Sequence, residues 1–131
     1  MADLNGDQIS DLAAVAQNFQ VAIRLGSAHG GWTTPGDPYG AANSGAFSIA
    51  VGDFNGDEIP DLAIATKSYT SGLILFGTGG GAFSGLTSFG LVGTMGIAVG
   101  DFNGDGALDI AVSEDGRSTV TLWLNTTGSC H

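Results

Sequence analysis

Positive charge is scarce in this sequence. Its 131 residues include three Lys and Arg residues against thirteen Asp and Glu residues, which gives a formal net charge of −10. A surface that binds nucleic acid needs clustered basic side chains to neutralise phosphates, and the sequence has no such cluster. We therefore expect no nucleic-acid partner.

Long apolar runs, cysteine pairs and helical spacing of apolar residues are also missing. No run approaches the roughly 18 apolar residues of a membrane-spanning helix, so we expect no membrane insertion. Residues 1–7 lack the charged and apolar regions of a signal peptide, so in an exported protein this chain would be a mature segment or a fragment. The single cysteine, Cys130, cannot form an intramolecular disulfide.

What the sequence has instead is an acidic nine-residue motif in three copies. The pattern is Asp-x-Asn-Gly-Asp-x-x-x-Asp, and the copies begin 50 and 48 residues apart. They occupy residues 3–11, 53–61 and 101–109. A fixed period of this length is typical of proteins that stack one supersecondary unit several times.

Short apolar runs flank each motif and predict strands. They are rich in Val, Ile, Leu and Ala and are bounded by Gly, Asn or Asp, which is typical of strands rather than helices. A more polar fourth run is predicted over residues 32–43 in the first repeat and 83–92 in the second. Three strands in the first repeat, four in the second and three in the third make ten in all.

We predict an all-β fold of β-propeller blades, each with four antiparallel strands. A four-stranded unit of about 50 residues cannot cover both of its faces, so it must stack on similar units. Radial stacking gives a propeller, whereas a parallel β-helix or a sandwich is the alternative. Residues 1–131 then form a single repeat region, a partial propeller of two and a half to three blades with approximate boundaries 1–45, 46–94 and 95–131.

The acidic motifs are candidate metal sites. Oxygen-bearing side chains fall at positions 1, 3, 5 and 9, a spacing that lets a tight loop surround one ion, with a backbone carbonyl from position 7 filling a gap. Hard oxygen donors without His or Cys favour Ca²⁺ over zinc. The three aspartates of the pattern in each motif account for nine of the thirteen acids, and three Ca²⁺ would change the net charge from −10 to −4. The alternative is a solvated acidic turn that uses Asp and Asn for backbone hydrogen bonds. An EF-hand is excluded because position 12 carries no acid.

The segments 49–57 and 97–105, each followed by Asp-Leu-Ala or Asp-Ile-Ala, resemble FG-GAP/VCBS repeats. Such repeats form the calcium-binding blades of integrin α-subunit-like propellers and of many bacterial secreted and surface proteins. The resemblance implies about three Ca²⁺ ions, an extracellular or cell-surface location, and five ligands in each loop. The implied ligands are Asp3, Asn5, Asp7, the Ile9 carbonyl and Asp11; Asp53, Asn55, Asp57, the Ile59 carbonyl and Asp61; and Asp101, Asn103, Asp105, the Ala107 carbonyl and Asp109.

Two features depart from the family pattern. Position 6 of the motif, often Gly in the family, is Gln8 in the first loop and Glu58 in the second. The strand expected before Asp3 is missing.

Other signals are weaker. The run from Gly77 to Ala82 imitates a dinucleotide-binding fingerprint, but further glycines interrupt the helix that such a site needs. Neither His29, in a Gly-rich turn, nor the terminal His131 is placed as a catalytic base, so we expect no enzyme activity. Trp32 and Phe83 are either sugar-stacking platforms or, as the resemblance implies, aromatic anchors of the fourth strand. Residues 125–127 form an N-glycosylation sequon.

The sequence thus predicts a non-catalytic, extracellular, calcium-binding propeller module for adhesion, recognition or self-assembly. A carbohydrate-binding propeller lectin and an accessory module of a larger secreted enzyme are the alternatives. The fold does not determine the partner, so protein and glycan ligands both stay open. Because propellers close with about four to eight blades, we expect self-association or pairing with the rest of a longer propeller.

Overall fold

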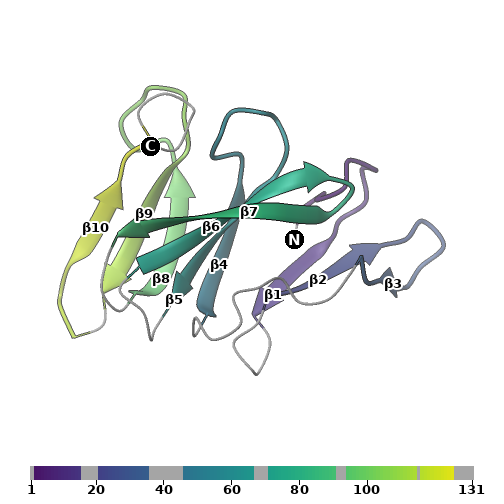
Figure 1. The fold of residues 1–131 in the computed structure, drawn as a ribbon, viewed down its shortest axis with the longest axis horizontal. Coiled ribbons are helices and arrows are strands. Elements are labelled where there is room, and N and C mark those ends of the chain that lie inside the picture. Colours follow the sequence, from purple (N-terminus) through teal and green to yellow (C-terminus); the bar gives the residue numbers. More distant parts are fainter. Residues whose placement is uncertain are drawn as a thin grey trace.

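The chain forms three antiparallel β-sheets that fan out side by side (Figure 1). The computed structural model describes residues 2–15, 21–35, 46–66, 71–90, 94–114 and 116–125, and the elements in these ranges are ten strands with no helix. The predicted all-β fold of antiparallel propeller blades, not closed into a ring, is confirmed.

The middle sheet is a complete four-stranded blade. Its strands pair in sequence order, so each strand lies beside the next in a simple meander. The second strand is buried along its whole length because a neighbouring sheet covers each face of this blade. The strands are β4 (Ala46–Gly52), β5 (Asp61–Thr66), β6 (Ser71–Gly79) and β7 (Ala82–Gly90).

Each flanking sheet has three strands in the described part of the chain. The first contains β1 (Leu12–Val15), β2 (Val21–Gly26) and β3 (Trp32–Thr33), and the third contains β8 (Thr94–Gly100), β9 (Asp109–Glu114) and β10 (Val120–Trp123). We call the sheets blade 1, blade 2 and blade 3 in chain order. Of the strand predicted over 32–43, Trp32–Thr33 forms β3, residues 34–35 are not in a strand, and residues 36–43 lie outside the described residues. The strand predicted over 83–92 is β7.

All three blades share one register at the acidic motifs. Gly52 pairs with Asp61 in blade 2, and Gly100 pairs with Asp109 in blade 3. In blade 1, Ala2 forms an isolated antiparallel bridge with Asp11, the same pair of motif positions. The bridge lies where the first strand of blades 2 and 3 pairs with the second strand. In blade 1, this one pair is the described counterpart of that pairing.

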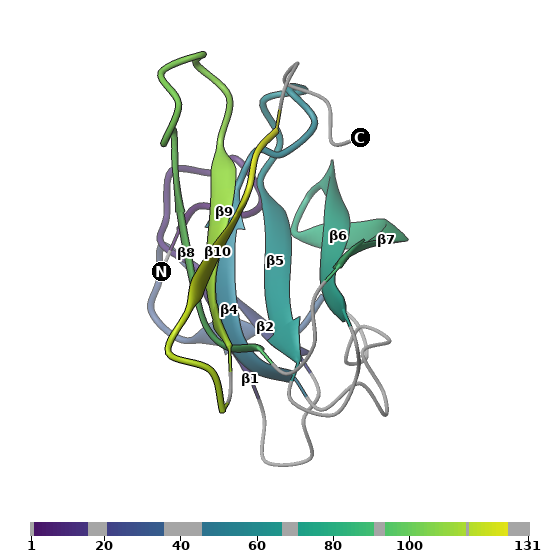
Figure 2. The same cartoon turned by 90° about the vertical axis from the view of Figure 1, so that its left-hand side faces the viewer.

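The hydrophobic core lies between the sheets and not within one of them. Strands β4 and β8 run side by side, and β1 also contacts β4 (Figure 2). One buried cluster joins blades 1 and 2, and it contains Leu4, Val21, Ile23, Ala46, Leu62, Ile64, Leu75 and Phe83. The other joins blades 2 and 3, and it contains Phe54, Ala63, Ile74, Phe89, Ile110 and Val112.

The described residues contain no helix that is long and apolar enough to cross a membrane.

Candidate metal centres in the acidic loops

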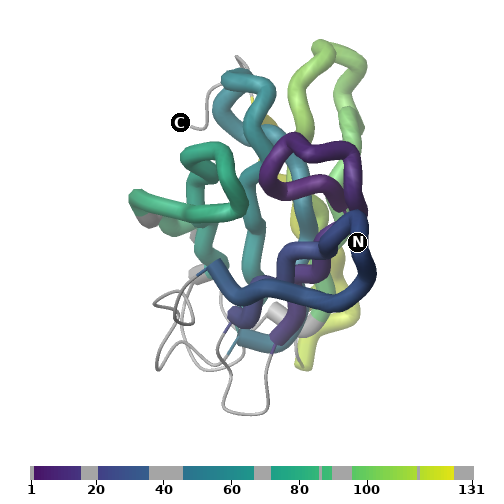
Figure 3. The backbone as a smooth tube through the Cα atoms, turned by 90° about the vertical axis from the view of Figure 1, so that its right-hand side faces the viewer, coloured from purple at the N-terminus to yellow at the C-terminus, as the bar shows by residue number. Residues whose placement is uncertain are grey.

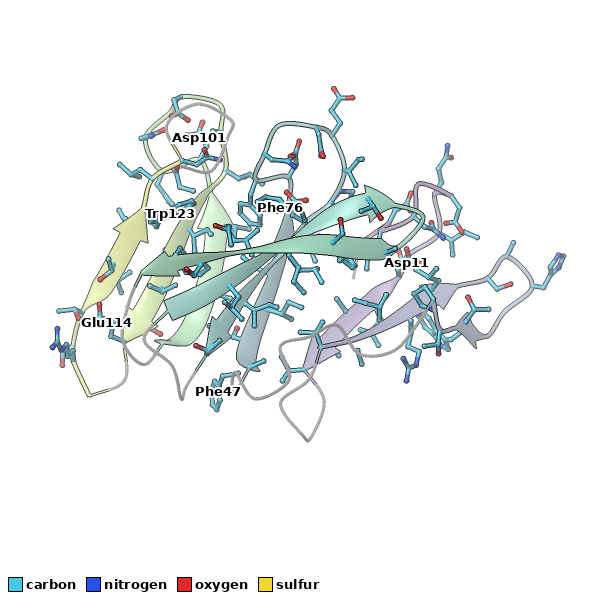
Figure 4. The ribbon with its side chains drawn as sticks, in the orientation of Figure 1. Asp11, Phe47, Phe76, Asp101, Glu114 and Trp123 are labelled. Carbon is cyan, nitrogen blue, oxygen red and sulfur yellow. The ribbon has the colours of Figure 1, made fainter. Side chains whose placement is uncertain are left out.

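The three acidic motifs are loops at the same end of their blades. Loop 2 (53–61) joins β4 to β5, loop 3 (101–109) joins β8 to β9, and loop 1 (3–11) leads into β1. Figure 3 shows them as the purple, teal and light green turns. In Figure 4, Asp101 marks this end of blade 3, and Glu114 lies at the other end.

The first aspartate of each loop organises the turn. In loop 2, Asp53 Oδ1 accepts hydrogen bonds from the backbone N–H of Gly56 at 2.7 Å and of Asp57 at 3.2 Å, while Oδ2 accepts one from Glu58 at 2.8 Å. Asp3 and Asp101 accept the matching three bonds in their loops, at 2.6–3.2 Å. The carboxylate therefore holds the backbone of positions 4 to 6 around itself.

Positions 3 and 5 add a second set of bonds. Asn55 Oδ1 accepts a bond from the Asp57 N–H at 3.1 Å, and Asn55 Nδ2 donates to Asp57 Oδ2 at 3.0 Å. Asp57 Oδ1 in turn accepts from the Ile59 N–H at 2.9 Å. The same three bonds recur in loops 1 and 3.

Two positions in each loop adopt left-handed backbone angles. The glycine at position 4 has φ of 79–80° in all three loops, a conformation that glycine adopts at low cost. Position 6 has φ of 66° at Gln8, 65° at Glu58 and 88° at Gly106. The departure from the family pattern therefore places two side chains where a left-handed backbone is strained.

The ninth aspartate differs from the others because it is fully buried. Asp61 Oδ2 accepts a bond from the Phe54 N–H, and Oδ1 accepts one from the Gly77 N–H, both at 2.8 Å. Asp61 thus ties the start of loop 2 to β6, the third strand of its blade. Asp11 and Asp109 form the same ties, to Leu4 and Gly26 and to Phe102 and Asn125.

This structural role of the ninth aspartate was not predicted from the sequence, which indicated a metal ligand only. The signal that could have revealed it is the glycine at Gly26 and Gly77. A Cβ at Gly77 would lie 2.2 Å from the Pro60 carbonyl oxygen, and one at Gly26 would lie 2.6 Å from that of Ser10. Glycine therefore accompanies the bond to the buried carboxylate in blades 1 and 2, while Asn125 donates the matching bond in blade 3.

Negative charge accumulates in the loops. Burial raises the pKa of Asp61 above its usual value; bonds from Gly77 and Phe54 oppose this shift, and the charges of Asp57 and Asp53 add to it. For Asp101, hydrogen bonds led by the Gly106 N–H lower the pKa. For Asp3, desolvation raises the pKa, but the combined backbone hydrogen bonds outweigh it and the net shift is downward.

Side-chain cations do not offset this charge. In the part of the chain that the structure describes, the recorded ion pair is Arg117 with Glu114, at 3.8 Å, and it includes no loop aspartate. Each loop therefore carries three aspartates, and no ion pair recorded among the described residues joins one of them to a basic side chain.

Each loop contains all of its predicted side-chain ligands, but they are not gathered into a preformed centre. Among the described residues, no three Asp, Glu, His or Cys side chains form a group that could already hold a metal ion. Their oxygens are turned toward backbone N–H groups instead. A carboxylate oxygen that accepts one hydrogen bond keeps a further lone pair, and the donor set is carboxylate and amide oxygen throughout. This chemistry fits a hard divalent cation such as Ca²⁺.

The structure also places most of the other residues that the sequence analysis singled out. The glycines at 79–81 lead into strand β7 and not into a helix, so the dinucleotide-binding motif lacks its required context. His29 is exposed in a turn. Phe83 is 7% exposed and belongs to the core, whereas Trp32, at the equivalent position of blade 1, is 55% exposed and belongs to neither buried cluster of the described residues. His131 and Cys130 lie outside the described residues.

Two stretches of the chain, residues 3–64 and 54–112, match the profile of the FG-GAP-like repeat. Together they include all three acidic loops. No curated protein shows a significant match to the chain.

Proposed function

The chain belongs to the FG-GAP-like repeat family, and on this basis we propose that it is a non-catalytic, calcium-binding β-propeller module. Its proposed role is adhesion, recognition or assembly outside the cell.

The observation that carries the calcium proposal is the shared frame of the three loops. Each frame holds three aspartates and one asparagine at matching positions within nine residues, and no ion pair recorded among the described residues joins them to a basic side chain. Like charges held this close are costly unless a cation compensates them. In loop 2, burial is the main cause of the raised pKa of Asp61, and the charges of Asp57 and Asp53 add to the shift.

The residues that would hold the ion are those named from the sequence. In loop 2 they are Asp53, Asn55, Asp57 and Asp61, together with the carbonyl of Ile59. Bound Ca²⁺ would supply positive charge to the loop and connect residues that the hydrogen bonds already hold near one another. The buried ninth aspartate would then link each ion to the third strand of its blade.

An extracellular location agrees with this chemistry. Extracellular modules bind Ca²⁺ with dissociation constants of about 10⁻⁴–10⁻³ M, so loops of modest affinity are filled there. A chain with a net charge of −10 also gains most from a solution rich in divalent cations.

The decisive experiment is calorimetric titration of the chelated protein with Ca²⁺, with Mg²⁺ as the comparison ion. We expect three ions per chain and a melting temperature that rises with Ca²⁺. A site filled at 100 times its dissociation constant adds about 2.7 kcal/mol to the free energy of unfolding. No heat and unchanged melting at millimolar Ca²⁺ would contradict the proposal.

Loop 2 offers a matched pair of variants for this titration. Asp57→Asn and Glu58→Gln each replace one acid by its amide. Loop 1 already has an amide, Gln8, at the position equivalent to Glu58. Only Asp57 is a proposed ligand. Asp57→Asn should weaken one of the three sites by about tenfold, or about 1.4 kcal/mol, while Glu58→Gln should leave three sites of nearly unchanged affinity.

The carbohydrate-binding alternative depends on Trp32, whose side chain is 55% exposed. Exposed aromatic faces stack on sugar rings in many lectins, so titration with a panel of sugars tests this alternative directly. A change in tryptophan fluorescence that Trp32→Ala abolishes would support it. The absence of heat and of a fluorescence change at millimolar sugar would exclude it.

A further inference from the structure

No described part of the chain covers the two outer faces of the fan. We call the face of a blade that points toward the preceding blade its N-side face, and the face that points toward the following blade its C-side face. Figure 2 looks onto the C-side face of blade 3, and Figure 3 looks at the molecule from the side of blade 1. Blade 2 is covered on both faces, so it shows what each kind of face looks like when it is occupied.

The N-side face of blade 1 carries large apolar residues at two positions that are buried in blade 2, while the exposed Arg24 stands where blade 2 has the buried Leu75. Leu62 and Phe83, on the N-side face of blade 2, are 0% and 7% exposed because blade 1 packs on them. Their equivalents in blade 1 are Leu12, 37% exposed, and Trp32, 55% exposed. Trp32 pairs with Gly26 in the same register in which Phe83 pairs with Gly77.

The C-side face of blade 3 shows the same relationship. Phe54 and Ile74, on the C-side face of blade 2, are both 0% exposed because blade 3 covers them. The equivalent residues of blade 3 are Phe102, 49% exposed, and Leu122, 52% exposed. Val120 and Leu124 extend this apolar surface along β10, at 68% and 45% exposed.

A hollow lies on the sheet that carries this face. It has a volume of about 220 Å³ and is lined by small and aliphatic residues of β8, β9 and β10, among them Gly96, Ala98, Ala111 and Val120. Unlike the faces of blade 2, which meet a neighbouring blade with large side chains, this sheet leaves room for a bulky group to enter.

We propose that a second copy of this chain covers these faces head to tail, with blade 1 of one copy packed on blade 3 of the other. The occupant follows from the chain itself, because among the described residues the surfaces that cover the faces of blade 2 are blades of the same repeat. One copy carries both complementary surfaces. The proposal rests on the assembly role proposed above, and it names the partner and the two faces that meet. It does not require bound calcium.

Head-to-tail contact makes the pairing asymmetric, which sets the design of the test. Leu12→Arg places a charge on the N-side face of blade 1, and Leu122→Arg places one on the C-side face of blade 3. Both leucines are partly exposed, so a folded chain can accommodate either arginine. Ser118→Arg, in an exposed turn between β9 and β10, adds the same charge away from both faces.

The measurement is the mass in solution at micromolar concentration, by light scattering and sedimentation, in Ca²⁺ and in EDTA. The parent chain and Ser118→Arg should both exceed the monomer mass of 13.1 kDa. Leu12→Arg and Leu122→Arg should each be monomeric when alone. Mixed in equal amounts, the two should form a complex of about 26 kDa, twice the chain mass, because one intact pair of faces remains.

Two results would overturn the proposal. If the parent chain is a folded monomer up to about 100 μM, another occupant covers these faces, such as further blades of a longer chain. If Leu12→Arg alone still assembles, two C-side faces of blade 3 pair with each other, and the contact is not head to tail. Calcium binding, measured on the same samples by calorimetry, reports separately on the proposed function, so failure of one does not imply failure of the other.

Discussion

Asn125 Nδ2 donates a hydrogen bond of 2.9 Å to the backbone carbonyl of Phe54, which lies 71 residues earlier in the chain. The bond joins blade 3 to the acidic loop of blade 2. Asn125 holds the position that Gly26 and Gly77 occupy in the other blades, and its own N–H donates to Asp109 at 2.8 Å. One residue therefore connects two blades and completes a loop.

Replacing Asn125 by alanine should loosen the contact between blades 2 and 3. The side chain is 1% exposed, and losing its hydrogen bond should lower the free energy of unfolding by about 1 kcal/mol. Removal of Oδ1, which has no hydrogen-bond partner among the described residues, offsets part of the loss. Urea unfolding of the variant in EDTA measures the change, with Asn103→Ala in an exposed loop as the comparison. An unchanged midpoint would show that the bond does not stabilise the interface.

The same burial predicts that the sequon at Asn125 carries no glycan in the folded protein. Its Nδ2, the atom that would be modified, lies in the interface and already donates to Phe54. We expect glycosidase treatment to leave the mass of secreted, folded protein unchanged. Gly116→Asn creates an exposed sequon at 116–118 as a positive control, at a position whose φ of 73° asparagine tolerates. Folded protein with a glycan on Asn125 would contradict this arrangement.

Relieving the left-handed backbone at position 6 should stabilise the loops. Glu58→Gly and Gln8→Gly remove strain of about 1–2 kcal/mol, while the greater freedom of glycine in the unfolded chain returns about 0.4–1 kcal/mol. Each variant should therefore gain about 0.5–1 kcal/mol in urea unfolding without calcium. Gly106→Gln makes the reverse change in loop 3 and should lose a similar amount. Destabilisation by both glycine variants would refute the assignment of strain.

The buried and exposed aspartates of loop 2 should respond differently to chelation. Asp61→Ala removes the acceptor of two backbone N–H bonds and should cost about 3 kcal/mol or more in EDTA as well as in Ca²⁺. Asp57 is exposed, so Asp57→Ala should cost little in EDTA and should reduce mainly the stabilisation that Ca²⁺ provides. Paired thermal melts of both variants separate the structural role from the proposed metal-binding role. Equal losses in EDTA would contradict the distinction.

Much of this protein could be predicted from residues that are neighbours in the sequence. The motif Asp-x-Asn-Gly-Asp carries its own turn, because the side chain of Asp53 bonds to backbone groups three to five residues later. Apolar runs bounded by Gly and Asp likewise defined the strands and their number. Local hydrogen bonds and strand periodicity are encoded within short windows, so they could be recognised without a structure.

Burial was decided by contacts between distant parts of the chain. Trp32 and Phe83 stand at equivalent positions, yet one is exposed and the other is in the core, since only Phe83 has another blade packed on its face. In the sequence, the ninth aspartate has the same predicted role as the other aspartates of its loop. Its structural role follows from its contact with the third strand of the blade. In the sequence, Asn125 was identified only as the first residue of a sequon. Its hydrogen bond to Phe54 forms because blade 3 packs on blade 2. The sequence by itself determined the repeated unit, its strands and its acidic loops. Only the tertiary structure decided which copies of each residue are covered, because coverage depends on which blade lies alongside.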